Sequence, residues 1–389
     1  MSWNILRPKQ PLLGVIIAGG LTVLTSTAPV WGQNESDKVT ASDGAANDEF
    51  GGRVSIDGDT AIVGAKFNDD GGTDSGSAYI FEQDSVDPLV WNQVTILTAE
   101  DDEAGDRFGR SVAISGNVVV VGAVWDDHGG FTDAGSAYIF RFSNGSWTQE
   151  AKLTASDAAS NDEFGRSVAI DSNVVLIGAP RDDLGSQINA GSAYIFRYSS
   201  GSWSEKDKIT ASDGVSFDNF GFSVSVLDDV ALIGMPFDDD VFQVSGAAYI
   251  FNHTASDWTE TVKLTASDDE EGDSFGWSVA LETDVAVVGA IFGGVTFSST
   301  GSAYVFRFDG TDWNEEAELE ASEGLSGFGS NVAISGDTII SGTPNHDQSG
   351  LTDAGSAWVF HYDGTNWVEE AMLTASDAAQ ATSWGRGSD

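Results

Sequence analysis

A motif that recurs six times at nearly constant spacing is the feature that most constrains the fold of this chain. The Phe-Gly pairs begin at Phe50, Phe108, Phe164, Phe220, Phe275 and Phe328, and Trp384-Gly385 begins a partial seventh copy. In every complete copy the glycine that ends an apolar run follows the Phe by 14 positions, as Gly122 follows Phe108. The copies differ in length only in segments with loop composition, so each copy is predicted to be one structural unit.

Each unit divides into four segments with strand character. In the second copy these read FGRSVAI, VVVVGA, GSAYIFRF and a fourth segment around EAKL, with turn residues at Gly116-Asn117 and Asn144-Gly145. The second and third segments are apolar at successive positions, so both of their faces need cover. Because one four-stranded sheet cannot cover its own two faces, neighbouring units must do so. This predicts an all-β fold, a β-propeller of four-stranded antiparallel blades.

The number of blades follows from the repeats with one alternative left open. Six complete repeats predict six blades, while residues 38–43, which match the end of a fourth segment, and the partial unit at 384 would suit seven blades with an incomplete last one. We expect the six-bladed ring to close. Within it, Gly109 and Gly122 are predicted to lie where backbones crowd, and Phe108 to wedge between blades.

The paired motifs resemble a known family. Phe164-Gly165 together with Gly178-Ala179-Pro180 is similar to the FG-GAP repeat of integrin alpha-chain propellers and of many secreted bacterial proteins, and the bacterial branch is the closer match. The resemblance covers about residues 38–389 and implies a role in binding or cell adhesion. The calcium loop of integrins has no counterpart, because the turn between the first two strands has only two or three residues. Its ligands are therefore not carried over.

Composition and the N-terminus limit partners and location. Lys and Arg total 17 against 61 Asp and Glu, a formal charge of −44, which excludes nucleic acid as a partner. The absence of cysteine excludes disulfides and thiolate sites. Arg7 and Lys9 precede an apolar stretch, so residues 1–32 are predicted to be a signal peptide, with a retained membrane anchor as the alternative. Residues 33–389 would form one monomeric domain without a transmembrane span, secreted, on the cell surface or in the periplasm.

Acidic loops follow the second segment of several repeats. Carboxylates gathered on loops can supply the oxygen ligands that calcium prefers. The candidate metal ligands are Asp69, Asp70, Asp74, Asp126, Asp127, Asp133, Asp182 and Asp183. The alternative is that Asp serves turn formation and solubility, since no segment has the spacing of a known calcium loop.

Aromatic residues interrupt the acidic loops of the fourth and fifth repeats. Phe237, Phe242, Phe292 and Phe297 are predicted to form a recognition patch for a protein or a glycan on the acidic loop face. The alternative is that they fold back onto the blade edges.

Catalytic motifs are weak in this sequence. His128 and His346 stand beside Asp127 and Asp347 in equivalent loops of different repeats. A His-Asp neighbour could serve acid–base chemistry, yet a solvated loop histidine is the commoner case. We therefore expect a secreted or surface-bound, non-enzymatic binding or adhesion propeller. A secreted hydrolase or lyase acting on polysaccharide is the alternative, and a structural surface or matrix module is a third.

Overall fold

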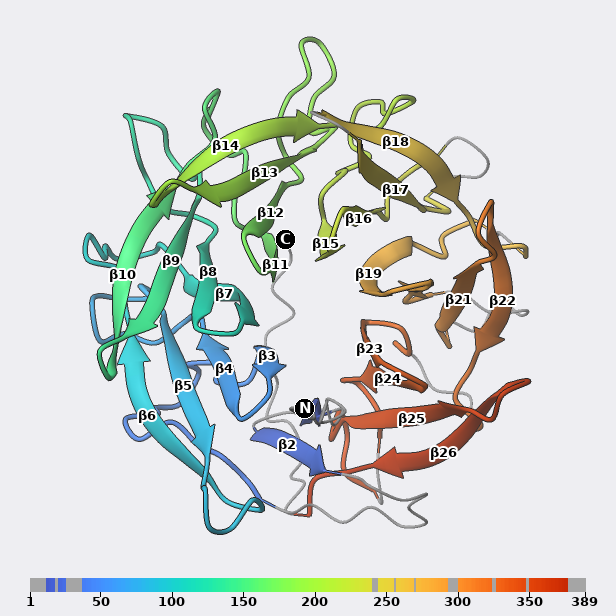
Figure 1. Ribbon diagram of the computed structural model, residues 1–389, viewed down its shortest axis with the longest axis horizontal. Helices are drawn as coiled ribbons and strands as arrows, with labels where there is room; N and C mark the ends of the chain where they lie inside the picture. The colour runs from blue at the N-terminus through green and yellow to red at the C-terminus, as the bar shows by residue number, and fades with distance from the viewer. Residues whose placement is uncertain are drawn as a thin grey trace, which may run out of the picture.

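A computed structural model describes residues 12–17, 20–25, 37–239, 244–254, 257–268, 271–292, 300–323, 327–347 and 350–376. Six four-stranded antiparallel sheets are arranged around a central axis (Figure 1). This confirms the predicted all-β propeller with six complete repeats. The partial seventh repeat at Trp384 lies outside the described residues.

The sheets are numbered as blades in chain order. Blade 1 contains β3 (Arg53–Asp57), β4 (Thr60–Ala65), β5 (Ser77–Gln83) and β6 (Trp91–Leu97), and blade 2 contains β7 (Phe108–Ser115), β8 (Val118–Ala123), β9 (Ser136–Ser143) and β10 (Ser146–Leu153). Blade 3 contains β11 (Ser167–Asp171), β12 (Val174–Ala179), β13 (Ser192–Ser199) and β14 (Ser202–Ile209), and blade 4 contains β15 (Ser223–Leu227), β16 (Val230–Met235), β17 (Ala247–Thr254) and β18 (Asp257–Leu264). Blade 5 contains β19 (Phe275–Glu282), β20 (Val285–Ala290), β21 (Ser302–Phe308) and β22 (Trp313–Leu319), and blade 6 contains β23 (Asn331–Ser335), β24 (Thr338–Thr343), β25 (Ser356–Tyr362) and β26 (Trp367–Leu373).

Strand position within a blade follows the hydrophobic pattern. The first strand of each blade lies nearest the axis and the fourth lies on the outside (Figure 1). Every residue of β8, β12 and β20 is buried, as expected for strands covered on both faces, whereas the outer strand β10 mixes exposed and buried positions. The sheets therefore stack face to face around the ring.

The Phe of each Phe-Gly pair fills the space between two blades. Phe108 is fully buried and meets Tyr138 and Phe140 of its own blade edge-on, with ring centroids 5.5 and 5.9 Å apart. Ile62 and Ile80 of blade 1 belong to the same apolar cluster. Equivalent clusters join blades 2 and 3, 3 and 4, 4 and 5, and 5 and 6. The predicted wedge is thus confirmed.

The repeated glycines allow the backbones of adjacent blades to approach. A Cβ atom on Gly64 of blade 1 would lie 2.1 Å from the carbonyl oxygen of Gly109 in blade 2. Gly109 has φ of 87° and a Cβ there would meet the Ser77 carbonyl oxygen at 2.3 Å. The crowding predicted for these glycines is therefore real, and its source is the neighbouring blade.

The junction between blades 6 and 1 differs from the other five. Blade 1 and blade 6 each have an apolar cluster of their own, and in the described part of the chain no cluster spans this junction. Phe50, at the blade 1 side, is only partly buried, while the other five Phe residues are fully buried. The N-terminal hairpin of β1 (Leu12–Ile17) and β2 (Gly20–Thr25) lies at this junction, where β1 contacts β3 and β24 (Figure 1). Cleavage of this segment as a signal peptide stays a prediction.

Candidate functional site

One face of the propeller collects the sequence features singled out above. In blade 2 the register aligns Ser111 with Gly122, Gly122 with Ala137, and Ala137 with Leu153. The start of the first strand, the loop between the second and third strands, and the end of the fourth strand therefore lie at the same face. We call this the FG-side face, because each Phe-Gly pair begins there.

The first Asp of the candidate metal loops is held in a buried network. Asp126 is 2% exposed, and its carboxylate accepts hydrogen bonds from Ser136 Oγ at 2.6 Å and Tyr138 Oη at 3.0 Å. Lys152 Nζ lies 2.9 Å from Asp126 Oδ1 and 2.7 Å from Asp101 Oδ2. Asp182 in blade 3 has the same kinds of partner, with Lys208 Nζ at 2.6 Å. These carboxylates are already neutralised by protein groups.

The Asp that follows this buried position closes a turn, and in blade 1, where Asn68 holds the buried position, that residue is Asp69. Asp127 Oδ1 accepts from the backbone N–H of Asp133 at 2.7 Å, and Asp69 Oδ1 accepts from that of Asp74 at 2.9 Å. Asp183 makes the same contact with Asn189 N at 2.8 Å. Asp74 and Asp133 adopt positive φ of 56° and 51°, a conformation that Asp tolerates better than most residues. Turn formation thus accounts for these positions.

Blade 1 departs from this pattern. Ile96 stands where blades 2 to 4 have lysine, opposite Tyr79, and a hydrogen bond with Asp43 raises the pKa of the Asp70 carboxyl, with further repulsion from Asp48. If calcium binds to the acidic loops, we expect it in blade 1, because no lysine at this position neutralises the carboxylates. Within the described residues, however, no three such side chains are arranged to hold a metal ion. Calcium binding stays a prediction.

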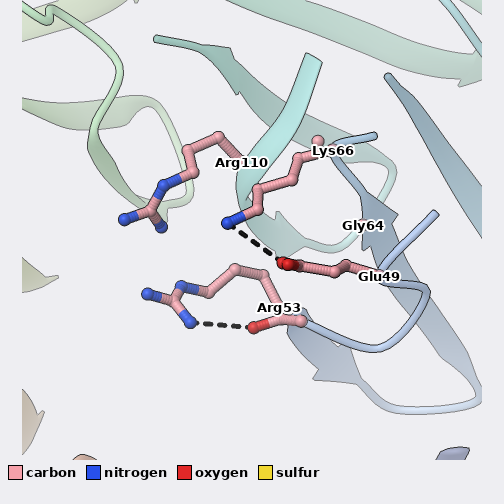
Figure 2. A pocket seen from close by; sticks show the side chains of 7 residues that line it. Glu49, Arg53, Gly64, Lys66 and Arg110 are labelled. Carbon is pink, nitrogen blue, oxygen red and sulfur yellow. Dashed lines mark hydrogen bonds and ion pairs between the residues drawn. The ribbon is translucent and has the colours of Figure 1, made fainter. Parts of the chain in front are cut away.

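A cationic cavity lies at the axial end of this face (Figure 2). Glu49, Arg53, Lys66 and Arg110 line it with three glycines, and it encloses about 180 Å³. Lys66 Nζ pairs with Glu49 Oε2 at 3.0 Å, and Arg53 Nη1 donates to the backbone oxygen of Gly52 at 2.8 Å. Among the described residues, no hydrogen bond or ion pair engages the Arg110 guanidinium. The cavity therefore presents two arginine groups that have no direct ion pair with a carboxylate in the described part of the chain, although Glu49 and Glu163 lie close enough to raise their pKa values slightly against the effect of burial.

Like charges crowd this cavity. Burial, followed by repulsion from Arg166, lowers the pKa of Arg53 to about 10. Burial, followed by repulsion from Arg53 and Arg166, places the pKa of Arg110 well below its usual range. The Arg53 side chain is exposed, yet the surrounding atoms of the cavity limit its solvation. A pKa of about 10 still leaves Arg53 positively charged at neutral pH.

Aromatic side chains occupy the equivalent positions in the next blades around the ring. The Arg166 guanidinium lies 4.7 Å from the ring centroid of Phe222, and the Phe222 and Trp277 centroids are 4.7 Å apart. Phe237 meets both rings edge-on, at 5.9 and 6.3 Å. We call the residues that follow the Phe-Gly pairs the axial mouth: Gly52 with Arg53, Arg110, Arg166, Phe222, Trp277 and Ser330. The mouth is cationic in blades 1 to 3 and aromatic in blades 4 and 5.

The predicted aromatic patch is only partly described. Phe237 is half-buried against Phe222 and Trp277, and Phe292 is 52% exposed. Phe242 and Phe297 lie outside the described residues. Sequence reasoning did not identify the mouth, although the residue after each Phe-Gly pair changes from Arg to Phe to Trp while its neighbours stay constant. That contrast was the available signal.

The two candidate catalytic histidines lie in separate blades. His346 is 4% exposed and its Nδ1 lies 2.7 Å from Ser356 Oγ, so it takes the place that Asp126 has in blade 2. His128 Nδ1 lies 3.4 Å from Asp126 Oδ2. His128 contacts Asp126 of blade 2 and His346 contacts Ser356 of blade 6, and among the described residues no contact joins the two histidines.

Comparisons with known proteins agree with this architecture. A family model of the FG-GAP repeat matches residues 31–81, 91–140, 147–196, 203–251, 258–306 and 313–360. No curated protein sequence matches the chain. Among solved structures, the crystal structure of a putative 6-phosphogluconolactonase from Bacteroides fragilis NCTC 9343 is similar, with a TM-score of 0.58, 9% sequence identity and 92% coverage of each chain.

That structural similarity concerns the fold alone, because the sequence identity is so low. Within the described residues, no helix is long and apolar enough to span a membrane. The repeat model matches most of the chain. Each of its six units contains one Phe-Gly pair and the first three strands of one blade, and from the second unit on it begins with the outer strand of the preceding blade. The chain therefore belongs to the FG-GAP repeat family.

Proposed function

We propose that this protein is a secreted or surface-bound, non-enzymatic binding propeller that recognises a glycan through the axial mouth. The observation that carries this proposal is the contrast between frame and mouth. Frame residues such as Phe164 and Gly178 recur in every complete repeat, whereas the position after the Phe-Gly pair holds Gly, Arg, Arg, Phe, Trp and Ser in blades 1 to 6. A recognition surface built on a symmetric scaffold needs such local variation, because function resides in the site and not in the fold.

The aromatic part of the mouth supports a carbohydrate ligand. Phe222 and Trp277 are half-buried, so part of each ring remains accessible while neighbouring rings hold it in place. Rigid aromatic side chains offer contact area at low entropic cost, which suits the apolar faces of sugars. Arg166, stacked on Phe222, adds hydrogen-bond donors beside that surface.

The proposal is tested with Phe222→Ala and Trp277→Ala against a glycan panel. Phe308→Ala is the matched control, because Phe308 is also partly exposed, at 37%, but lies at the far end of β21. Binding should fall about tenfold or more in the two mouth variants and stay unchanged in the control. Equal binding by all variants would contradict glycan binding at the axial mouth. Turnover of the panel glycans or of a sugar lactone would contradict a non-enzymatic function.

A further inference from the structure

We propose that the axial mouth contains an oxyanion site between Arg53 and Arg110, which receives a carboxylate, sulfate or phosphate group of an acidic glycan. This inference rests on the proposed function, since it names the chemical class of the ligand for the same mouth. It is unexpected for a chain of formal charge −44, whose overall field repels anions. A local cationic cavity is what lets such a chain select an acidic group.

The geometry places the two guanidinium groups on one cavity. Arg53 belongs to β3 and Arg110 to β7, the innermost strands of adjacent blades. Figure 2 shows both side chains extending toward the same open side of the cavity, with Lys66 between them. Planar guanidinium groups present their donors in a fixed fork that matches the oxygens of carboxylate, sulfate or phosphate.

The charge balance distinguishes these arginines from those at the blade edges. Arg141 Nη2 lies 2.8 Å from Glu150 Oε2, and Arg307 Nε lies 3.0 Å from Glu316 Oε1. In the described part of the chain, no carboxylate forms a direct ion pair with Arg53 or Arg110, and only the weaker influence of Glu49 and Glu163 opposes their mutual repulsion. Glu49, the acidic residue in the cavity wall, is paired with Lys66. An anion bound in the cavity would therefore be stabilised by Arg53 and Arg110.

The surroundings connect this site to the aromatic part of the mouth. Repulsion from Arg166 lowers the pKa of both Arg53 and Arg110. Arg166 also stacks on Phe222 in the next blade. Arg166 is itself paired with Glu163 at 3.4 Å, so it is less available to a ligand. An acidic group at Arg53 and Arg110 would leave the attached sugar ring directed along the mouth toward Phe222 and Trp277.

The test uses Arg53→Gln and Arg110→Gln, singly and together, with Arg141→Gln as the control at a paired arginine. Without added anion, the mouth variants should melt at a higher temperature than the native protein, because like-charge repulsion is removed. The control should not gain stability. Sulfate and phosphate, compared with chloride at equal ionic strength, should raise the melting temperature of the native protein and much less that of the double variant.

Titrations with polygalacturonate, dextran sulfate and neutral dextran identify the source of the anionic group. We expect each single substitution to weaken binding of an acidic polymer about tenfold or more, with neutral dextran unaffected. Unchanged affinity in the double variant, or free phosphate binding with no acidic polymer binding, would overturn the inference. The proposed function would still stand if Trp277→Ala reduced glycan binding in that case. Conversely, the arginine variants could lose binding of the acidic polymer while Phe222→Ala and Trp277→Ala keep it. That result would support the oxyanion site and refute the aromatic contribution to the proposed function.

Discussion

Lys152 and Asp126, 26 positions apart in the sequence, form a buried ion pair that is present or absent as a unit from blade to blade. Their charged atoms are 2.9 Å apart. Blades 3 and 4 keep both partners, as Lys208 with Asp182 and Lys263 with Asp238. In blade 1 the equivalent residues are Ile96 and Asn68, and in blade 6 they are Met372 and His346. Blades 1 and 6 therefore replace both members of the pair together, and blade 5, with Glu318 opposite Tyr304, also lacks the lysine.

This exchange predicts a strong coupling between the two positions. Lys152→Ile leaves a buried carboxylate without its cation and should destabilise the protein by about 3 to 5 kcal/mol. The double variant Lys152→Ile with Asp126→Asn reproduces blade 1 and should recover most of that loss. A double-mutant cycle measured by urea unfolding gives the coupling energy. Additive effects of the two substitutions would show that the pair does not act as a unit.

The junction between blades 6 and 1 makes a second prediction. Phe164→Ala removes a fully buried ring between blades 2 and 3 and should cost about 3 to 5 kcal/mol. Phe50→Ala removes the equivalent ring from a partly buried position, where the apolar clusters formed by the described residues stay within one blade, so its cost should be clearly smaller. Urea unfolding of the two variants under identical conditions measures the difference. Equal losses would mean that the sixth junction is as tightly packed as the others.

The sequence predicted the frame well because the frame depends on local, repeated constraints. Phe108, Gly109 and Gly122 recur in register, and their packing between blades could be inferred from that repetition alone. The role of Asp126 could not, because its partner Lys152 is brought to it only by the pairing of β9 with β10. A loop Asp looks the same whether it binds a metal or a lysine.

The mouth was missed for a related reason. Arg53 occupies the position held by Ser111 in blade 2, while Arg110 follows its Phe-Gly pair directly, so the two arginines are not equivalent in the repeat. Only the closeness of β3 and β7 brings them to one cavity. The partial burial of Phe50 likewise depends on the packing of blade 6 against blade 1, which repeat spacing does not specify.

Two linker carboxyls predict how stability depends on pH. Burial raises the pKa of Asp106 to about 7 and that of Asp162 to about 6, and the nearby Asp126 and Asp182 add repulsion. Their pKa values in the unfolded chain are about 3.9, so the folded state holds more protons between about pH 4 and 7. The stability that they contribute is therefore present at low pH and is lost as the pH rises through 6 and 7.

Replacing these carboxyls should remove that dependence. Asp106→Asn with Asp162→Asn should raise the melting temperature at pH 8 and flatten its change between pH 5 and 8, since the amide oxygen can still accept the backbone hydrogen bonds from Glu103 and Ala159. Asp312→Asn, at an exposed turn, serves as the control. A variant whose melting temperature changes with pH as steeply as that of the native protein would place the source of the slope elsewhere.

The calcium prediction is best tested at blade 1, where the acidic residues are expected to bind the ion. Asp43 and Asp70 share a hydrogen bond there, and a divalent cation would relieve the repulsion among them and Asp48. We expect millimolar calcium, compared with magnesium at equal ionic strength, to raise the melting temperature by several degrees and Asp70→Asn to remove that gain. Asp183→Asn should keep it, because the side-chain oxygen at this position already accepts the Asn189 backbone N–H that closes its loop, and an amide oxygen can do the same. Identical melting curves in calcium and in chelator would assign these aspartates to turn formation and solubility alone.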